Sequence, residues 1–120
     1  AGGMVVNVGA VGMPFNGDRR AQYAIFTGDG DGWEVELRRV EYDLERIFAV
    51  YEESGFLAEG GVTARLLRLE LEHAAPFLVP FLEWARATGV EAAGSQLEPF
   101  LDVFEPGGSL RAFFRSLRKP

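Results

Sequence analysis

Residues 23–40 read YAIFTGDGDGWEVELRRV, and this stretch decides the first part of the fold. Tyr23–Thr27 is an apolar run, Gly28–Gly32 alternates glycine with aspartate, and Trp33–Val40 alternates apolar with charged side chains. Successive side chains of a strand point to opposite faces, so this alternation predicts one buried and one wet face. Two such runs joined by a glycine-rich turn predict an antiparallel hairpin.

Two aspartates in the turn, Asp29 and Asp31, leave a second interpretation open, a calcium loop. A loop of the EF-hand type needs more oxygen ligands and a distal glutamate. A glycine-rich hairpin turn is therefore the preferred interpretation.

A third strand is expected upstream, over Met4–Val8, because this short apolar run ends in glycines. Gly9–Gly17, with its three glycines, Pro14 and an Asn16-Gly17 pair, is expected to be a loop.

Downstream of Tyr42 the apolar period changes from two to 3.6, which predicts helices. Asp43 and Ser109 are expected N-caps, and Ser95–Glu98 has capping-box spacing. Pro76 is expected near a helix start, and Pro80 to kink that helix or delay its start. The five expected helices cover about 43–55, 62–73, 76–89, 95–104 and 109–117, with Gly55 and Gly89 as terminators.

About three antiparallel strands followed by helices predict an α+β fold. This arrangement leaves one sheet face and one sheet edge without cover. We therefore expect the missing sheet partners to lie upstream or in another subunit.

The composition excludes several classes of protein. The 120 residues are 48% hydrophobic and 25% charged, as in soluble globular proteins. No apolar run approaches the roughly 20 residues of a membrane span, and no signal peptide is visible, so a cytoplasmic location without membrane contact is expected. The absence of cysteine excludes disulfides and thiolate metal sites.

The charge is unevenly distributed. The net charge is −6, with 11 acids and 5 bases in residues 1–60 but 7 of each in residues 61–120. An acidic chain with one short basic end is a poor candidate for nucleic-acid binding. That end, with Arg111, Arg115, Arg118 and Lys119, fits either a capping helix with a wet face or contact with an anionic surface.

The segment Asn7–Gly12 invites comparison with a dinucleotide-binding loop. That fingerprint requires three glycines and a following helix, whereas the first glycine position here is Asn7 and Met13–Asp18 cannot start a helix. A tight loop with positive φ at Gly9 and Gly12 is the simpler interpretation.

Three segments carry a family resemblance. Val5–Pro14, VVNVGAVGMP, resembles the "vvNPGSVGxP" segment of calcineurin-like metallophosphoesterases. Asp18–Ala24 is similar to that family's "gdpRAsYa", and Arg38–Asp43 to its "rRVpYD" strand-to-helix junction. The resemblance covers about residues 3–61 and only loosely the helical remainder.

The resemblance implies that the chain is the C-terminal portion of such an enzyme. Residues 1–60 would supply terminal strands and the first helix of a four-layer α/β fold, and residues 61–120 a helical extension of the same domain. The intact parent would hydrolyse a phosphomonoester or phosphodiester with two divalent metals of the Mn, Fe, Zn or Mg type. Its partners would be the upstream half and the substrate, and a homo-oligomer is compatible with it. Substrate contacts are expected at Asn7, Gly9, Gly12 and Arg20.

Departures from the family pattern limit the expected chemistry. Val8 and Ala10 replace the family's Pro and Ser, and Phe15 stands where Arg is common. The family's ligand motifs, Asp-x-His, Gly-Asp-x-x-Asp, Gly-Asn-His and Gly-His-x-His, are absent, and the single histidine, His73, is expected to end a helix. We therefore expect no catalytic residue, no metal ligand and no activity in this chain alone. The alternative function is a non-catalytic dimerisation or partner-binding module.

Overall fold

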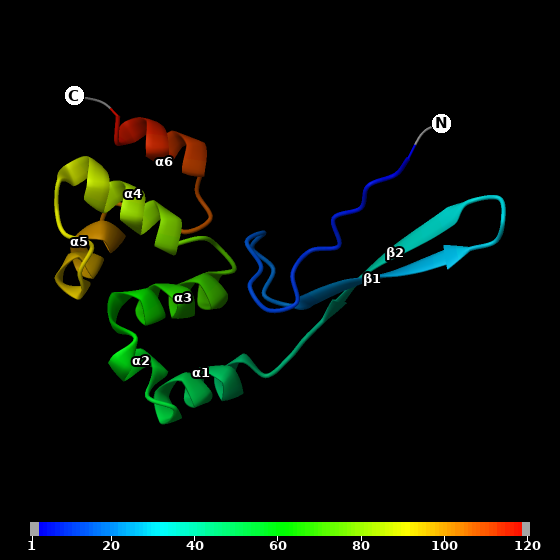
Figure 1. Ribbon diagram of the computed structural model, residues 1–120, viewed down its shortest axis with the longest axis horizontal. Helices are drawn as coiled ribbons and strands as arrows, with labels where there is room; N and C mark the ends of the chain where they lie inside the picture. Colours follow the sequence, from blue (N-terminus) through cyan, green and yellow to red (C-terminus); the bar gives the residue numbers. More distant parts are fainter. Residues whose placement is uncertain (1–2, 119–120) are drawn as a thin grey trace.

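The computed structural model describes residues 3–118 and has two parts, a β-hairpin and a set of helices (Figure 1). Strand β1 (Ala21–Gly28) pairs antiparallel with β2 (Trp33–Val40), in a register that runs from Ala21 opposite Val40 to Gly28 opposite Trp33. The hairpin and the α+β class are thus confirmed. Asp31 donates its N–H to Asp29 Oδ1 at 3.1 Å, so these aspartates shape the turn.

The five expected helices are present in order, and the short helix α2 (Phe56–Glu59) was not expected. The helices are α1 (Leu44–Glu53), α2, α3 (Gly61–His73), α4 (Leu78–Thr88), α5 (Leu97–Leu101) and α6 (Leu110–Ser116), with the 3₁₀ turn η1 (Gly94–Gln96) before α5. The two expected N-caps are confirmed: Asp43 accepts the N–H of Arg46 at 2.9 Å, and Ser109 that of Ala112 at 3.2 Å.

Two helix starts differ from the expectation. Ser95 makes no capping hydrogen bond, and its segment is a 3₁₀ turn that leads into α5, so the predicted capping box is wrong. Pro76 precedes α4, which begins at Leu78, two residues later. Pro80 lies in the first turn of α4, where a backbone N–H would have no acceptor within the helix. The proline therefore removes no hydrogen bond, and the predicted late start is confirmed.

The hydrophobic core lies among α3, α4, α5 and α6. Phe77, Phe81 and Phe100 are fully buried, and Phe81 meets Phe100 edge to face with ring centroids 5.4 Å apart. Phe104 continues this stack, 4.9 Å from Phe100. Such aromatic pairs add to the stabilisation from area burial. The predicted apolar stripes of α4 and α5 therefore form one core.

The first helix contacts α3 through Phe48. Phe48 is the buried residue of α1, and the guanidinium of Arg68 in α3 lies 4.9 Å above its ring. Leu44, Ile47 and Tyr51, which follow the same helical spacing as Phe48, are only partly buried.

The predicted strand Met4–Val8 is wrong. Residues 3–10 form neither helix nor strand, and Val5 is 99% exposed. A strand needs a partner for its backbone N–H and C=O groups, and the described chain gives this apolar run none.

The hairpin also lacks the predicted buried face. Directly opposed residues share a face, so Ala24, Phe26, Trp33, Val35 and Leu37 form one side, here called the apolar hairpin face. Phe26 is 49% exposed and Trp33 69% exposed. The alternation of the sequence is therefore present, but Phe26, Trp33 and Leu37 on its apolar side remain at least 49% exposed.

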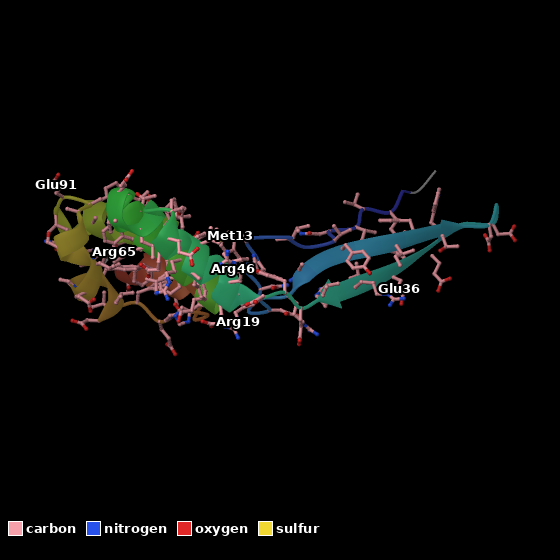
Figure 2. The ribbon with its side chains drawn as sticks, turned by 90° about the horizontal axis from the view of Figure 1, so that it is seen from below. Met13, Arg19, Glu36, Arg46, Arg65 and Glu91 are labelled. Atoms are coloured by element: carbon pink, nitrogen blue, oxygen red, sulfur yellow. The ribbon has the colours of Figure 1, made fainter. Side chains whose placement is uncertain are left out.

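The described chain is extended and flat. Its radius of gyration is 18.4 Å, where a compact domain of 120 residues has about 14 Å. Figure 2 shows the cause: the hairpin, with Glu36 on it, projects as a thin ribbon away from the helical part, where Arg65 of α3 and Glu91 of the loop after α4 lie. Within the described residues, none of the helices is long and apolar enough to cross a membrane.

Candidate functional site

The segment Asn7–Gly12 forms a loop that packs on the start of β1. Asn7 Oδ1 accepts the N–H of Gly9 at 3.0 Å, and Gln22 donates its N–H to the carbonyl of Ala10 at 3.0 Å. The side-chain oxygen of Asn7 is therefore already engaged within its own turn.

Gly9 and Gly12 have different roles in this loop. Gly9 has φ +92°, and a Cβ at this position would lie 2.7 Å from Cδ and 2.8 Å from Cβ of Gln22. Both conditions require glycine. Gly12 is not among the positive-φ residues, and a Cβ on it would meet nothing within 4 Å. The predicted need for glycine is confirmed at Gly9 and wrong at Gly12.

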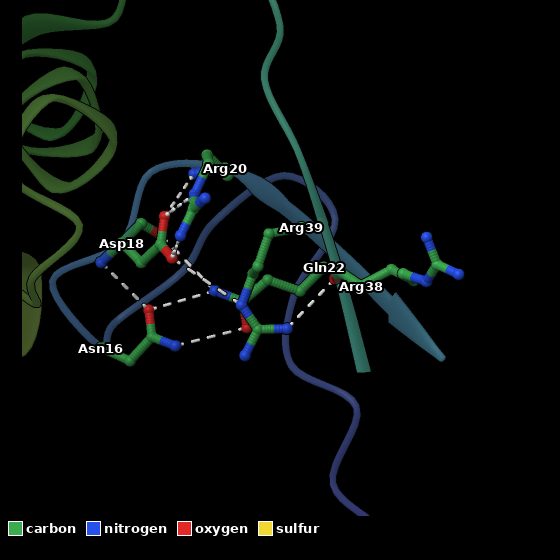
Figure 3. A network of polar contacts seen from close by, with 6 residues as sticks. All are labelled: Asn16, Asp18, Arg20, Gln22, Arg38 and Arg39. Carbon is green, nitrogen blue, oxygen red and sulfur yellow. Dashed lines mark hydrogen bonds and ion pairs between the residues drawn. The ribbon is translucent and has the colours of Figure 1, made fainter. Parts of the chain in front are cut away.

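A polar network joins the next part of the chain, residues 16–20, to the hairpin (Figure 3). Asn16 and Gln22 pair through both amides: Asn16 Nδ2 donates to Gln22 Oε1 at 3.3 Å, and Gln22 Nε2 donates to Asn16 Oδ1 at 3.1 Å. Gln22 is 2% exposed, so this pairing satisfies a buried amide. Asp18 donates its backbone N–H to Asn16 Oδ1 at 3.2 Å.

Arg20 is bound by an acid rather than left open toward a ligand. Its Nε donates to Asp18 Oδ1 at 2.9 Å and its Nη2 to Asp18 Oδ2 at 2.7 Å, a bidentate ion pair. Arg39 of β2 adds a weaker ion pair, with Nε 3.7 Å from Asp18 Oδ2. The side-chain and backbone hydrogen bonds from Arg20, together with the charges of Arg20 and Arg39, lower the pKa of Asp18 to about 2.

The four expected contact residues therefore do not form one site. Asn7 and Gly9 are joined by a hydrogen bond, whereas Arg20 is paired with Asp18 and Gly12 is exposed. The sequence interpretation overlooked Asn16, Asp18 and Gln22. The available signal was their spacing. Together with Arg20 they recur at every second residue, which places their side chains on the same side of an extended segment.

The three segments that resemble the metallophosphoesterases meet in this network. The first supplies the Asn7–Gly12 loop, the second supplies Asp18 and Gln22, and the third supplies Arg39. The backbone N–H of Gln22 joins the second segment to Ala10 of the first, and the carboxylate of Asp18 joins it to Arg39 of the third.

A shallow hollow of about 420 Å³ lies beside the network, between the loop and the start of α1. Its lining is Arg19, Arg20, Glu41, Tyr42, Asp43, Leu44 and Glu45. The hydroxyl of Tyr42 is buried here and makes no hydrogen bond with the described residues, and burial raises its pKa. With acids and bases mixed, the lining has no preference for a phosphate.

The residues present do not fit a pair of divalent metals. Nowhere in residues 3–118 do three or more His, Asp or Glu side chains gather in a group that could hold a metal ion. His73 ends α3 as expected, and its ring lies 5.3 Å from that of Phe77. Metal ligands for the implied reaction would therefore have to come from outside this stretch.

Comparison with known proteins adds no relative: no family model, no curated protein and no solved structure matches the chain.

Proposed function

We propose that this chain is the C-terminal portion of a metal-dependent phosphoesterase of the calcineurin-like kind, completed by an upstream half that supplies the metal ligands. The observation that supports the proposal is that the second family-like segment contacts the other two, through the backbone hydrogen bond from Gln22 to Ala10 and the ion pair of Asp18 with Arg39. Contact among three family-like segments that lie apart in the sequence is more specific support than the resemblance of any one segment alone.

In the intact parent, the apolar hairpin face would pack on the upstream half, in a four-layer α/β fold. Phe26, Trp33 and Leu37 are each at least 49% exposed, which would be unfavourable unless another surface covers them.

The chain's own contribution to chemistry would be positioning. The loop Asn7–Gly12, fixed by Gln22, would form part of the wall near the phosphate of a monoester or diester. Asn7 and the backbone N–H groups are its available contacts, since Arg20 is neutralised by Asp18.

The test is to co-express the chain with the segment encoded directly upstream and to assay p-nitrophenyl phosphate and bis-p-nitrophenyl phosphate with Mn²⁺. We expect hydrolysis by the complex and none by the isolated chain. Equal activity of the isolated chain, or an upstream segment without a Gly-His-x-His motif, would contradict the proposal.

The second candidate is a non-catalytic dimerisation module. The exposed apolar hairpin face favours it too, because a second copy would cover this face as well as an upstream half would. Sedimentation of the chain alone separates the candidates. A dimer that Phe26→Ser dissociates supports the module, and a monomer supports the fragment.

A further inference from the structure

Helices α4 and α6 lie side by side (Figure 1). Their side chains line a groove. Its volume is about 570 Å³. The groove is lined from α4 by Val79, Glu83, Arg86 and Ala87, and from the α6 region by Phe114, Leu117 and Arg118.

A second hollow, of about 530 Å³, continues this groove over the outer face of α6. Arg111 and Arg115 line it together with Phe114 and Arg118, and these last two residues also line the first hollow. The two hollows therefore form one continuous surface, here called the α4–α6 groove.

The charge of this groove is one-sided. Arg111, Arg115 and Arg118 make no ion pair with another described residue, whereas Arg86 binds Glu83 at 2.6 Å. Glu83, the acid in the lining, is thus already neutralised. Three arginines one helical turn apart remain without an acidic partner along one side.

The floor of the same groove is apolar. Phe114 and Leu117 are only half-buried, and Val79 is 58% exposed. Basic residues that border an exposed apolar floor suit a ligand with the opposite charge and its own apolar stripe.

We propose that the α4–α6 groove binds an acidic amphipathic helix of a partner protein. The apolar stripe of that helix would lie on Val79, Phe114 and Leu117, and its acids would pair with Arg111, Arg115 and Arg118, as in other helix-in-groove complexes. The hollowed shape fits a helix better than a flat bilayer. The net charge of −6 opposes nucleic acid. This proposal is independent of the phosphoesterase proposal, which concerns the hairpin and its loop.

The test measures binding of a fluorescein-labelled designed helix of roughly five turns, with leucines on one face and glutamates beside them. A second probe has lysine in place of every glutamate. We expect the chain to bind the glutamate peptide, and Arg111→Glu/Arg115→Glu to raise its Kd at least about tenfold. Arg38→Glu/Arg46→Glu, a control with the same change of charge at exposed sites, is expected to leave the Kd unchanged.

Two further measurements keep the test independent of folding. Arg111→Gln/Arg115→Gln removes the charges but keeps a good helix former, and is expected to weaken binding in the same direction. Amide chemical shifts of Val79 and Ala87 are expected to move on addition of the glutamate peptide. No binding, equal binding of the lysine peptide, equal effects of both double charge reversals, or shifts confined to other regions would overturn the proposal. So would tighter binding to phosphatidylglycerol vesicles or to a single-stranded oligonucleotide.

Discussion

The carboxylate of Glu70, in the last turn of α3, accepts the backbone N–H of Phe77 at 2.9 Å. The same oxygen accepts the N–H of Leu78, also at 2.9 Å, so one side chain binds two of the donors that the start of α4 leaves free. Glu70 is only 5% exposed, and Phe77 is fully buried. This contact fixes how α4 follows α3.

Replacing Glu70 by alanine is therefore expected to destabilise the chain. The change leaves buried N–H groups without an acceptor, which costs about 2–3 kcal/mol in the free energy of unfolding. Glu70→Gln keeps an acceptor oxygen and is expected to cost less. Urea denaturation followed by far-UV circular dichroism measures both. Glu52→Ala, at an exposed site in α1, is the matched control, and an equal loss there would contradict the assigned role.

Gly9→Ala is expected to disturb the loop on β1. The substitution combines a positive φ with a collision against Gln22, and strain of this kind costs about 1–3 kcal/mol. The local readout is hydrogen exchange at the Gln22 amide, which donates to Ala10 and should lose protection. Gly12→Ala, where a Cβ meets nothing within 4 Å, should leave that protection unchanged.

Local patterns predicted the helices and the hairpin well, because their causes lie within a few residues. Asp43 and Ser109 cap helices through hydrogen bonds to residues three positions on. The alternation of Trp33–Val40 likewise specifies a strand whatever covers it. The role of Glu70 is not visible in the sequence, since its partners lie seven and eight residues away across a turn, and helical periodicity does not reveal them.

The strand Met4–Val8 and the site were predicted less well for the same reason. A strand depends on a partner elsewhere in the fold, and apolarity says nothing about whether that partner is present. Arg20 was expected to face a ligand because it is a cation in a family-like segment. Its partner, Asp18, lies two residues earlier, and this period-two spacing is a signal that the comparison with the family motif does not use.

The ion pair of Asp18 predicts a pH dependence. The pKa of Asp18 is lowered from its ordinary value of 3.8 to about 2, above all by the side-chain hydrogen bonds of Arg20. A lowered pKa means that the pair contributes its stabilisation in full above pH 3.8 and loses it as the pH falls toward 2. Carboxyl-carbon NMR titration measures this pKa directly.

Two substitutions separate the causes of that shift. Arg20→Gln is expected to return the pKa of Asp18 most of the way to 3.8. Arg39→Gln should change it less, because Arg39 lies 3.7 Å away and acts through its charge alone. A larger effect from Arg39 would show that the bidentate contact of Arg20 is not the main cause.

Truncating an aromatic side chain is expected to destabilise the chain much more in the helical core than on the apolar hairpin face. Phe81 is 1% exposed in the helical core, and Phe81→Ala should cost about 3–5 kcal/mol in the free energy of unfolding. Phe26 is 49% exposed on the apolar hairpin face, and Phe26→Ser should cost under about 1 kcal/mol in the isolated chain. Thermal denaturation of both variants measures this contrast.

The same Phe26→Ser variant is expected to bind the upstream half poorly, because that half is proposed to cover the apolar hairpin face. Calorimetric titration of the chain with that half should show at least about tenfold weaker binding for Phe26→Ser. Thr27→Ser, on the opposite face of β1, is the control and should bind as the unchanged chain does. If Phe26→Ser binds equally well, the apolar hairpin face is not the surface that the upstream half covers, and the proposed four-layer arrangement would have to place the hairpin differently.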